Sequence, residues 1–262
     1  MRIVLIGAGN LATNLAPALG SNHRVVQVWS RTEASAQALG HRLECPFTTE
    51  LSQVVTDADI YIISVVDSAL SDIARTLTEH ISQDAIVAHT AGSMPMSVIC
   101  HPNAGVFYPM QTFSRDKQVD FWGIPIFVEG HSPWANKVLM ELAYDLSQSV
   151  YPLSSEDRRY LHVAAVFACN FANHCYDLSS RLLEAHGIPF SVMLPLIEET
   201  ARKVHTLHPH DAQTGPAVRH DHNVMERHAD MLADNPDMQA LYRTMSQSII
   251  SAFASNDKPT NQ

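Results

Sequence analysis

Hydrophobic residues in the first half of the chain fall in short runs, and the runs alternate with segments whose apolar residues recur at helical spacing. This alternation is typical of a parallel sheet covered by helices on both faces. The runs predict strands at residues 2–6, 25–29, 60–65, 85–89, 105–108 and 124–128. The helical spacing predicts crossover helices at residues 11–19, 33–39, 69–80 and 134–147. We therefore expect an α/β fold with a doubly wound, Rossmann-like sheet.

The second half of the chain shows helical patterns and no further strand pattern after Ser154. Residues 161–185 form an apolar, alanine-rich helical segment, which Gly187 and Pro189 end. Further helices are predicted at residues 190–206 and 224–254, the latter with a break at Asn235 and Pro236. Since 262 residues exceed the usual size of one domain, we predict a dinucleotide-binding domain at 1–153 and an all-helical substrate and dimerisation domain at 154–262.

Composition and charge narrow the classes of partner. The chain is 46% hydrophobic and 17% charged, as expected of an ordinary globular protein. Its net charge of -10, without a cluster of Lys or Arg, argues against binding to nucleic acid. The apolar runs are too short for a signal segment or a bilayer span, so we expect a cytoplasmic protein with no membrane partner.

A glycine-rich turn follows the first predicted strand. It contains Gly7, Gly9, Asn10, Leu11 and Ala12, in the pattern Gly-x-Gly-x-x-Ala between a strand and a helix. The first glycine permits a tight turn, the second lets a pyrophosphate approach the backbone, and the alanine keeps the helix close to the strand. Free N–H groups and the helix dipole then favour the phosphates. The turn predicts a dinucleotide site, with a purely structural turn as the alternative.

The residues after the second predicted strand bear on the choice of cofactor. A site for NAD(H) usually has Asp or Glu there to bind the ribose 2′-OH, whereas this chain has Ser30, Arg31 and Thr32. A guanidinium and two hydroxyls suit a 2′-phosphate, so NADP(H) is favoured over NAD(H). The alternative is an exposed surface arginine, and the neighbouring Glu33 weakens the case for a phosphate.

The end of a later predicted strand is expected to line the nicotinamide side of the site, because ligands bind outside the carboxyl ends of parallel strands. It contains Ser64, Val65, Val66 and Asp67. Asp67 could instead cap the helix that follows.

Several segments together resemble one family, the Rossmann-like proteins with a DUF2520 domain, which are related to 6-phosphogluconate dehydrogenase-like and pyrroline-carboxylate reductase-like oxidoreductases. The segments that carry the resemblance are GAGNLA (7–12), SVVDSAL (64–70), HTAGS (89–93), YPMQTFS (108–114), LHVAAVFACNF (161–171) and TGPAVRHD (214–221). The resemblance implies a nicotinamide-dependent oxidoreductase whose helical domain forms a homodimer and closes the active site. It does not indicate a particular substrate.

One position departs from the pattern of the related β-hydroxyacid dehydrogenases. They carry a catalytic Lys four residues before an Asn on the first long helix of the second domain, and here that position is Val166. On a continuous helix His162, Asn170 and His174 would share a face. A histidine can exchange a proton near neutral pH, so His162 is predicted as the acid or base and Asn170 as the group that orients the substrate. The alternative is that these residues are structural and find hydrogen-bond partners at a helix interface.

The other predicted substrate residues lie in loops. His89, Ser93, Tyr108 and Gln111 follow two of the predicted strands and are expected to face the cleft.

Thr214 begins a turn into a predicted helix whose N–H groups could hold a substrate carboxylate, with Arg219 as its cationic partner. An ion pair between Arg219 and Asp221 is the structural alternative. The surrounding histidines, from His205 to His228, match no standard metal motif, so no metal is assigned, although a metal site is a minor alternative.

The sequence as a whole predicts an NADP-dependent oxidoreductase that acts on a small, anionic carbonyl, imine or hydroxy compound. The alternative is a sensor or scaffold dimer that binds NADP(H) without turnover, which the absent lysine favours.

Overall fold

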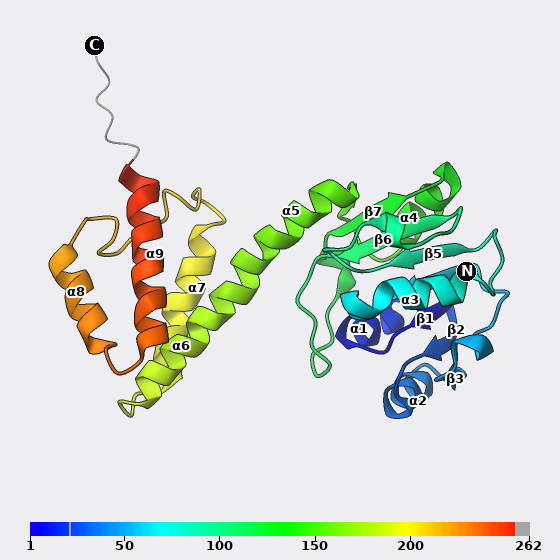
Figure 1. The fold of residues 1–262 in the computed structure, drawn as a ribbon, viewed down its shortest axis with the longest axis horizontal. Helices are drawn as coiled ribbons and strands as arrows, with labels where there is room; N and C mark the ends of the chain where they lie inside the picture. Colours follow the sequence, from blue (N-terminus) through cyan, green and yellow to red (C-terminus); the bar gives the residue numbers. More distant parts are fainter. Residues whose placement is uncertain (21, 255–262) are drawn as a thin grey trace, which may run out of the picture. The chain divides into compact units, whose positions relative to one another are not determined.

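The computed structural model describes residues 1–20 and 22–254 and divides the chain into two compact units, Met1–Asn170 and Phe171–Gln262. The first unit contains a single eight-stranded sheet with the strand order β3-β2-β1-β4-β5-β6-β7-β8 (Figure 1). Its strands are β1 Arg2–Ile6, β2 Arg24–Trp29, β3 Phe47–Thr48, β4 Ile60–Ile63, β5 Ile86–His89, β6 Ala104–Pro109, β7 Ile126–Gly130 and β8 Val150–Pro152. Its helices are α1 Asn10–Leu19, α2 Glu33–Arg42, α3 Asp67–Thr78, α4 Pro133–Tyr144 and α5 Ser155–Ala165. This is the predicted Rossmann-like α/β architecture.

Two hydrophobic cores lie on opposite faces of the sheet. Alternate residues of β1 point to opposite faces, with Ile3 and Leu5 in one core and Val4 and Ile6 in the other. The first core takes apolar side chains from α1 and α4, and the second takes them from α3. Burial on both faces explains why these strands read as continuous apolar runs in the sequence.

The sheet differs from the prediction at β7, which runs antiparallel to β6. The segment between these strands contains only the short 3-10 helix Phe121–Gly123, so no crossover helix carries the chain back to start a parallel strand. The strand β8 returns to the parallel direction because α4 connects it to β7. The strands β3 and β8 were not predicted, because segments of two and three residues are too short to show a pattern of hydrophobic positions.

The predicted long helix at residues 161–185 is not one regular helix. It consists of α5, a π-helical segment Val166–Phe171 and α6 Ala172–Glu184. The predicted domain boundary at 153/154 and the boundary between the compact units differ, because α5 and most of the π-helical segment group with the sheet.

The second unit contains α6, the 3-10 helix Phe190–Met193, α7 Leu194–Lys203, α8 His222–Met231 and α9 Pro236–Ala254. Its described part contains helices and no strand, in agreement with the sequence. Helices α8 and α9 are joined by the ion pair of Glu226 with Arg243. Within residues 171–254 the only buried hydrophobic side chains are those of Ala217, Met225, Ala229 and Met238.

None of the helices in residues 1–20 and 22–254 has the length and apolar character needed to cross a membrane.

Candidate functional site

The glycine turn is fixed by the strand next to it. Gly7 has a φ of +118°, and its N–H donates to the carbonyl of Trp29 on β2 at 2.8 Å. A Cβ at this position would overlap the carbonyl of Ser64, at the end of β4. Both observations explain the requirement for glycine, because an L side chain rarely adopts this φ and has no room here. Ala12 is fully buried, which keeps α1 close to the sheet.

The N-terminus of α1 is open above the turn. Gly9 is the N-cap residue, no side chain caps the helix, and a Cβ on Gly9 would meet no atom within 4 Å. The first N–H groups of the helix can therefore donate hydrogen bonds to a bound anion. The neighbouring Asn10 side chain is engaged elsewhere, because its Nδ2 donates to the carbonyl of Phe113 at 3.1 Å. Leu11 packs against the core beneath the turn.

The residues after β2 present polar groups at the same edge of the sheet. Ser30 is buried, and its N–H donates to the carbonyl of Thr48. Arg31 is exposed, and Thr32 is the N-cap residue of α2 without a side-chain capping bond. The Thr32 hydroxyl and the Arg31 guanidinium are therefore accessible to a ligand.

The end of β4 leads directly into α3. The Ser64 N–H donates to the carbonyl of Ile6 at 2.7 Å, and the Val65 side chain lies beside Gly7. Val66 is 65% exposed. Asp67 is the first residue of α3 and not its cap, and it accepts a hydrogen bond from the Ser93 hydroxyl. The structure thus joins one predicted cofactor residue to one predicted substrate residue.

A tyrosine and a histidine meet beyond the ends of β5 and β6. The Tyr108 hydroxyl lies 3.2 Å from Nδ1 of His162, and the two rings are arranged edge to face. Gly92 lies against both, and a Cβ there would overlap His162. Burial raises the pKa of Tyr108, and the nearby Arg158 opposes this in part. The phenol therefore stays protonated at neutral pH, and its hydroxyl can donate a hydrogen bond to Nδ1 of His162 in the tautomer whose ring N–H is Nε2.

A buried ion pair connects α5 to the sheet near this pair. Arg158 is 1% exposed and donates to Glu129 of β7 at 2.8 Å. The Ser155 hydroxyl also donates to Glu129, at 2.6 Å, and accepts from the Met96 N–H. This network could not be predicted from the sequence, because nothing in the helical pattern distinguishes the buried Arg158 from the exposed Arg159.

His89 is not placed as predicted. Its side chain is fully buried and its Nδ1 accepts from the Ala91 N–H, so it does not face a cleft of the first unit. Burial and, secondly, the Arg158 cation lower its pKa to about 4. His89 is therefore neutral at pH 7, and the hydrogen bond that it accepts from the Ala91 N–H holds the backbone just before Gly92.

The remaining predicted site residues are exposed. Gln111 accepts from the N–H of Thr112, and Asn170 lies in the π-helical segment, where no described residue hydrogen-bonds to its side chain. Because the segment is π-helical, the assumption of one α-helical face for His162 and Asn170 does not apply.

Thr214 and Arg219 belong to the second compact unit. The turn at Thr214 does not enter a helix directly, because α8 begins at His222 and the Asp221 carboxylate caps it by accepting from the Val224 N–H. Within the described part of the chain Arg219 has no ion pair, and the alternative pairing with Asp221 is not formed.

In the histidine-rich stretch, His210 stacks on Phe253 and His228 contacts the Tyr242 hydroxyl at 3.0 Å. The described residues contain no group of three or more His, Cys, Asp or Glu side chains that could hold a metal.

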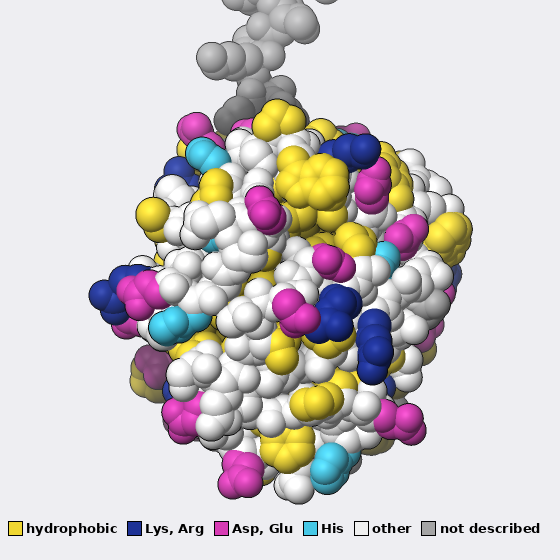
Figure 2. Space-filling view, turned by 90° about the vertical axis from the view of Figure 1, so that its right-hand side faces the viewer, with side chains coloured by type: hydrophobic (Ala, Val, Ile, Leu, Met, Phe, Trp, Pro, Cys, Tyr) yellow, Lys and Arg dark blue, Asp and Glu magenta, His cyan; other side chains and the backbone are white. Residues whose placement is uncertain are grey.

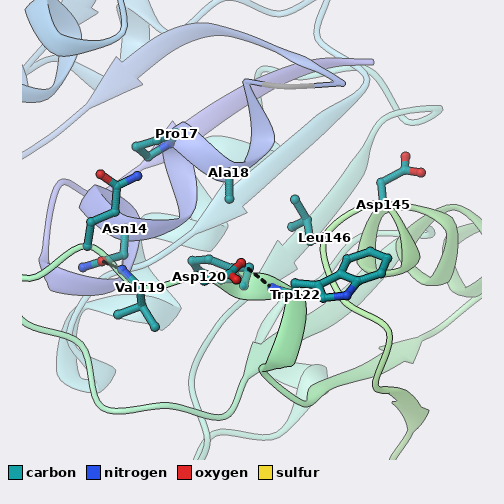
Figure 3. Close-up of a pocket in the computed structure, with 10 residues that line it drawn as sticks. Asn14, Pro17, Ala18, Val119, Asp120, Trp122, Asp145 and Leu146 are labelled. Carbon is teal, nitrogen blue, oxygen red and sulfur yellow. Dashed lines mark hydrogen bonds between the residues drawn. The ribbon is translucent and has the colours of Figure 1, made fainter.

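A cavity of about 530 Å³ lies on the flank of α1 and not over the glycine turn. Figure 3 shows Asn14 and Pro17 of α1 on one side of it, Val119 and Asp120 on the loop opposite, and Trp122 and Asp145 farther along. The Asn14 side chain connects the two walls, since its Oδ1 accepts from the Val119 N–H at 3.2 Å. The cavity therefore reflects how the loop after β6 rests on α1.

The face of the molecule in Figure 2 does not have the charge distribution expected of a surface that binds a polyanion. Basic side chains there are interspersed with acidic and hydrophobic ones and form no continuous basic patch.

Both halves of the chain resemble known protein families. Residues 1–105 match the model of a Rossmann-like domain, and residues 124–249 match a domain of unknown function, DUF2520. A Bacteroides fragilis protein, whose crystal structure is described as that of a "putative NADP oxidoreductase", is 52% identical, with 95% of this chain and 98% of that chain covered and a TM-score of 0.91. The chain therefore belongs to the family that combines a Rossmann-like domain with a DUF2520 domain.

More distant relatives share the fold or part of the sequence. An imine reductase from Myxococcus stipitatus in complex with NADP+ has a TM-score of 0.65 at 16% identity, with 97% of this chain and 93% of that chain covered. The glycerol-3-phosphate dehydrogenase [NAD(P)+] of Teredinibacter turnerae is 27% identical over 103 residues. That match covers 34% of this chain and 30% of the relative's length. These neighbours are dehydrogenases and reductases, in agreement with an oxidoreductase fold.

Proposed function

We propose that the protein is an NADP-dependent oxidoreductase that transfers a hydride between nicotinamide and a small, anionic carbonyl, imine or hydroxy compound. The observation that carries this proposal is the pair of Tyr108 and His162, which lies at the same carboxyl edge of the sheet as the glycine turn. Parallel strands place their carboxyl ends at one edge, where such folds bind their ligands. A proton-exchanging pair at that edge suits a reaction in which a proton accompanies a hydride.

The cofactor is proposed from the residues that can hold it. The open N-terminus of α1 above Gly9 accepts the pyrophosphate, and Ser30, Arg31 and Thr32 accept the 2′-phosphate of NADP(H) in preference to NAD(H). Val66, which is exposed at the end of β4, and Asp67 border the nicotinamide. The name of the 52% identical protein supports the choice of NADP(H).

The bound nicotinamide supplies or accepts the hydride, and the protein supplies position and a proton. Tyr108 donates to Nδ1 of His162, which directs the Nε2 proton toward the substrate oxygen or nitrogen. Ser93, held by Asp67, and Gln111 are proposed to bind the substrate. Asn170, Thr214 and Arg219 remain predicted contacts for its polar and anionic groups.

We also propose the functional division into a dinucleotide-binding domain at 1–153 and a substrate and dimerisation domain at 154–262. The helix α5, which carries His162, would then be part of the substrate domain by its function. In the structure it is grouped with the sheet in the first compact unit.

The test is turnover of NADPH and NADH with a panel of 2-oxo acids and cyclic imines. His162→Ala is expected to lower kcat by about 10²- to 10⁴-fold, as for the loss of a general acid or base. Tyr108→Phe is expected to lower kcat less, because it removes only the partner of His162. His174→Ala, an exposed histidine on α6, serves as the matched control and keeps full activity. Full activity of His162→Ala would overturn the catalytic assignment, and tight NADPH binding without any turnover would favour the sensor alternative.

A further inference from the structure

The loop between β6 and the 3-10 helix at Phe121 is fastened to α1 at two places. At one place Asn10 Nδ2 donates to the carbonyl of Phe113 at 3.1 Å, and Asn14 Nδ2 donates to that of Ser114 at 2.9 Å. At the other, the Val119 N–H donates to Asn14 at 3.2 Å. The segment between these anchors is therefore held beside the start of α1, the helix that follows the glycine turn.

Arg115 lies between the two anchors and reaches the glycine turn. Its Nη2 donates to the carbonyl of Ala8, the residue between Gly7 and Gly9, at 3.4 Å. This bond is long and its acceptor is neutral, so it is weak. None of the ion pairs of the described residues includes Arg115, whose side chain is exposed. A guanidinium thus lies at the turn with most of its donors available to a stronger acceptor.

We propose that Arg115 binds the pyrophosphate of the dinucleotide, so that the loop of residues 113–119 borders the cofactor site beside the start of α1. The inference rests on the proposed function, because it needs a dinucleotide over Gly9. A charge-assisted pair with a phosphate is stronger than the bond to Ala8, so the guanidinium exchanges one acceptor for the other when the cofactor arrives. The helix N-terminus and Arg115 then neutralise the two phosphates together.

This role differs from that of Arg31 in a measurable way. The 2′-phosphate is present only in NADP(H), whereas both cofactors carry the pyrophosphate. The loss of Arg115 therefore lowers the affinity for NADPH and for NADH by the same factor. The loss of Arg31 lowers the affinity for NADPH alone.

The experiment is calorimetric titration of the full chain with NADPH and with NADH, for the native protein and for the variants Arg115→Ala, Arg115→Lys, Arg31→Ala and Arg75→Ala. A charged hydrogen bond to phosphate is expected to contribute about 10- to 100-fold, so Arg115→Ala raises Kd for both cofactors by that factor. Arg115→Lys restores part of the affinity, because it keeps the charge and loses the planar pair of donors. Arg75→Ala, which removes an exposed arginine on α3 paired with Asp72, is the matched control and changes neither Kd.

Unchanged affinity of Arg115→Ala for both cofactors would overturn the inference, and so would a loss confined to NADPH, which would assign Arg115 to the 2′-phosphate. If the native protein binds neither cofactor, the proposed function and this inference fall together. If it binds both and Arg115→Ala binds them equally well, only the inference falls. Because Arg115 is exposed, thermal melting of the variant is expected to match the native protein, which separates lost binding from lost folding.

Discussion

At the scale of single residues, Gly92 sets the position of the proposed acid or base. A Cβ at this position would overlap His162 and would approach the Tyr108 hydroxyl to 3.0 Å. Gly92→Ala is therefore expected to displace the imidazole and to lower kcat by about 10-fold or more. The cost in stability should stay within the 1–3 kcal/mol typical of overpacking.

The matched control is Gly123→Ala, where a Cβ would meet no atom within 4 Å. It is expected to keep native kcat, KM and melting temperature. Equal activity of the two alanine variants would contradict the tight packing of Gly92 on His162.

His89 gives a prediction about pH and stability. Burial and the Arg158 cation lower its pKa to about 4, from 6.5 for the free side chain. Between these pH values the unfolded chain binds a proton at His89 and the folded chain does not, so the free energy of unfolding falls as the pH falls from 6.5 to 4. At about 1.4 kcal/mol per pKa unit, protonation at His89 lowers the free energy of unfolding by about 3 kcal/mol between pH 6.5 and pH 4.

Urea unfolding at several pH values, for the native protein and for His89→Asn, measures this contribution. The asparagine keeps an acceptor for the Ala91 N–H and does not titrate, so its stability is expected to depend less on pH. The pKa values of His23 and His101 are also lowered, mainly by burial. Because both residues are present in the native protein and in His89→Asn, they affect the pH dependence of both in the same way. Parallel pH profiles would show that His89 is not the titrating group.

The residues of the cofactor turn could be predicted from the sequence, and those of the buried network could not. Gly7, Gly9 and Ala12 belong to a local motif whose spacing fixes their geometry, and the structure shows a positive φ at Gly7, open space at Gly9 and a buried Ala12, while their contact with a cofactor stays a prediction. Arg158 and Arg115 act through contacts with residues distant in sequence, Glu129 and Ala8. No spacing within one helix or loop reveals such a partner.

At the scale of elements, the ion pair of Arg158 with Glu129 attaches α5 to β7. Removal of one partner leaves a largely buried charge unpaired, so Arg158→Ala is expected to lower the free energy of unfolding by about 3–5 kcal/mol. Arg159→Ala, the next residue on the same helix but exposed, is expected to change it by less than about 0.5 kcal/mol. Urea unfolding of both variants tests the difference, and equal stability would show that the pair does not hold α5.

The elements were predicted best where hydrophobic periodicity alone determines them. The six longest strands and the first four helices lie within a few residues of their predicted places. The π-helical segment Val166–Phe171 was not predicted, because its wider turn changes which residues share a face without changing the composition. The helix predicted from residue 224 begins at His222, after the Asp221 cap, whereas the expectation that the turn at Thr214 leads directly into a helix was wrong.

At the scale of the whole molecule, the second unit exposes more apolar surface than its small core explains. Ten large apolar side chains of its described part are at least 40% exposed: Phe171, Leu182, Ile188, Val192, Leu194, Leu196, Val204, Leu207, Met231 and Met245. Apolar surface of this extent is typical of protein interfaces. We therefore expect a homodimer in which a second copy of the chain covers this surface.

Sedimentation of the native protein is expected to give twice the mass of one chain. Leu196→Glu should dissociate the dimer or raise its dissociation constant at least 10-fold, because it would bury a charge in an apolar interface. Tyr144→Glu, at an exposed aromatic residue of α4 in the first unit, is the control and should sediment as the native protein does. A native protein that sediments as a monomer at all concentrations would contradict the prediction.

The place of β1 in the sheet has a consequence for the time course of folding. The strand β1 precedes the other strands of this sheet in the chain and lies between β2 and β4, and its pairing with β4 requires residues up to Ile63. Parallel pairings of this kind close long loops and form slowly, and synthesis adds only about 5–20 residues per second. β1 therefore stays without its β4 neighbour for seconds, and Gly7 comes to lie against the carbonyl of Ser64 only after β4 has joined β1.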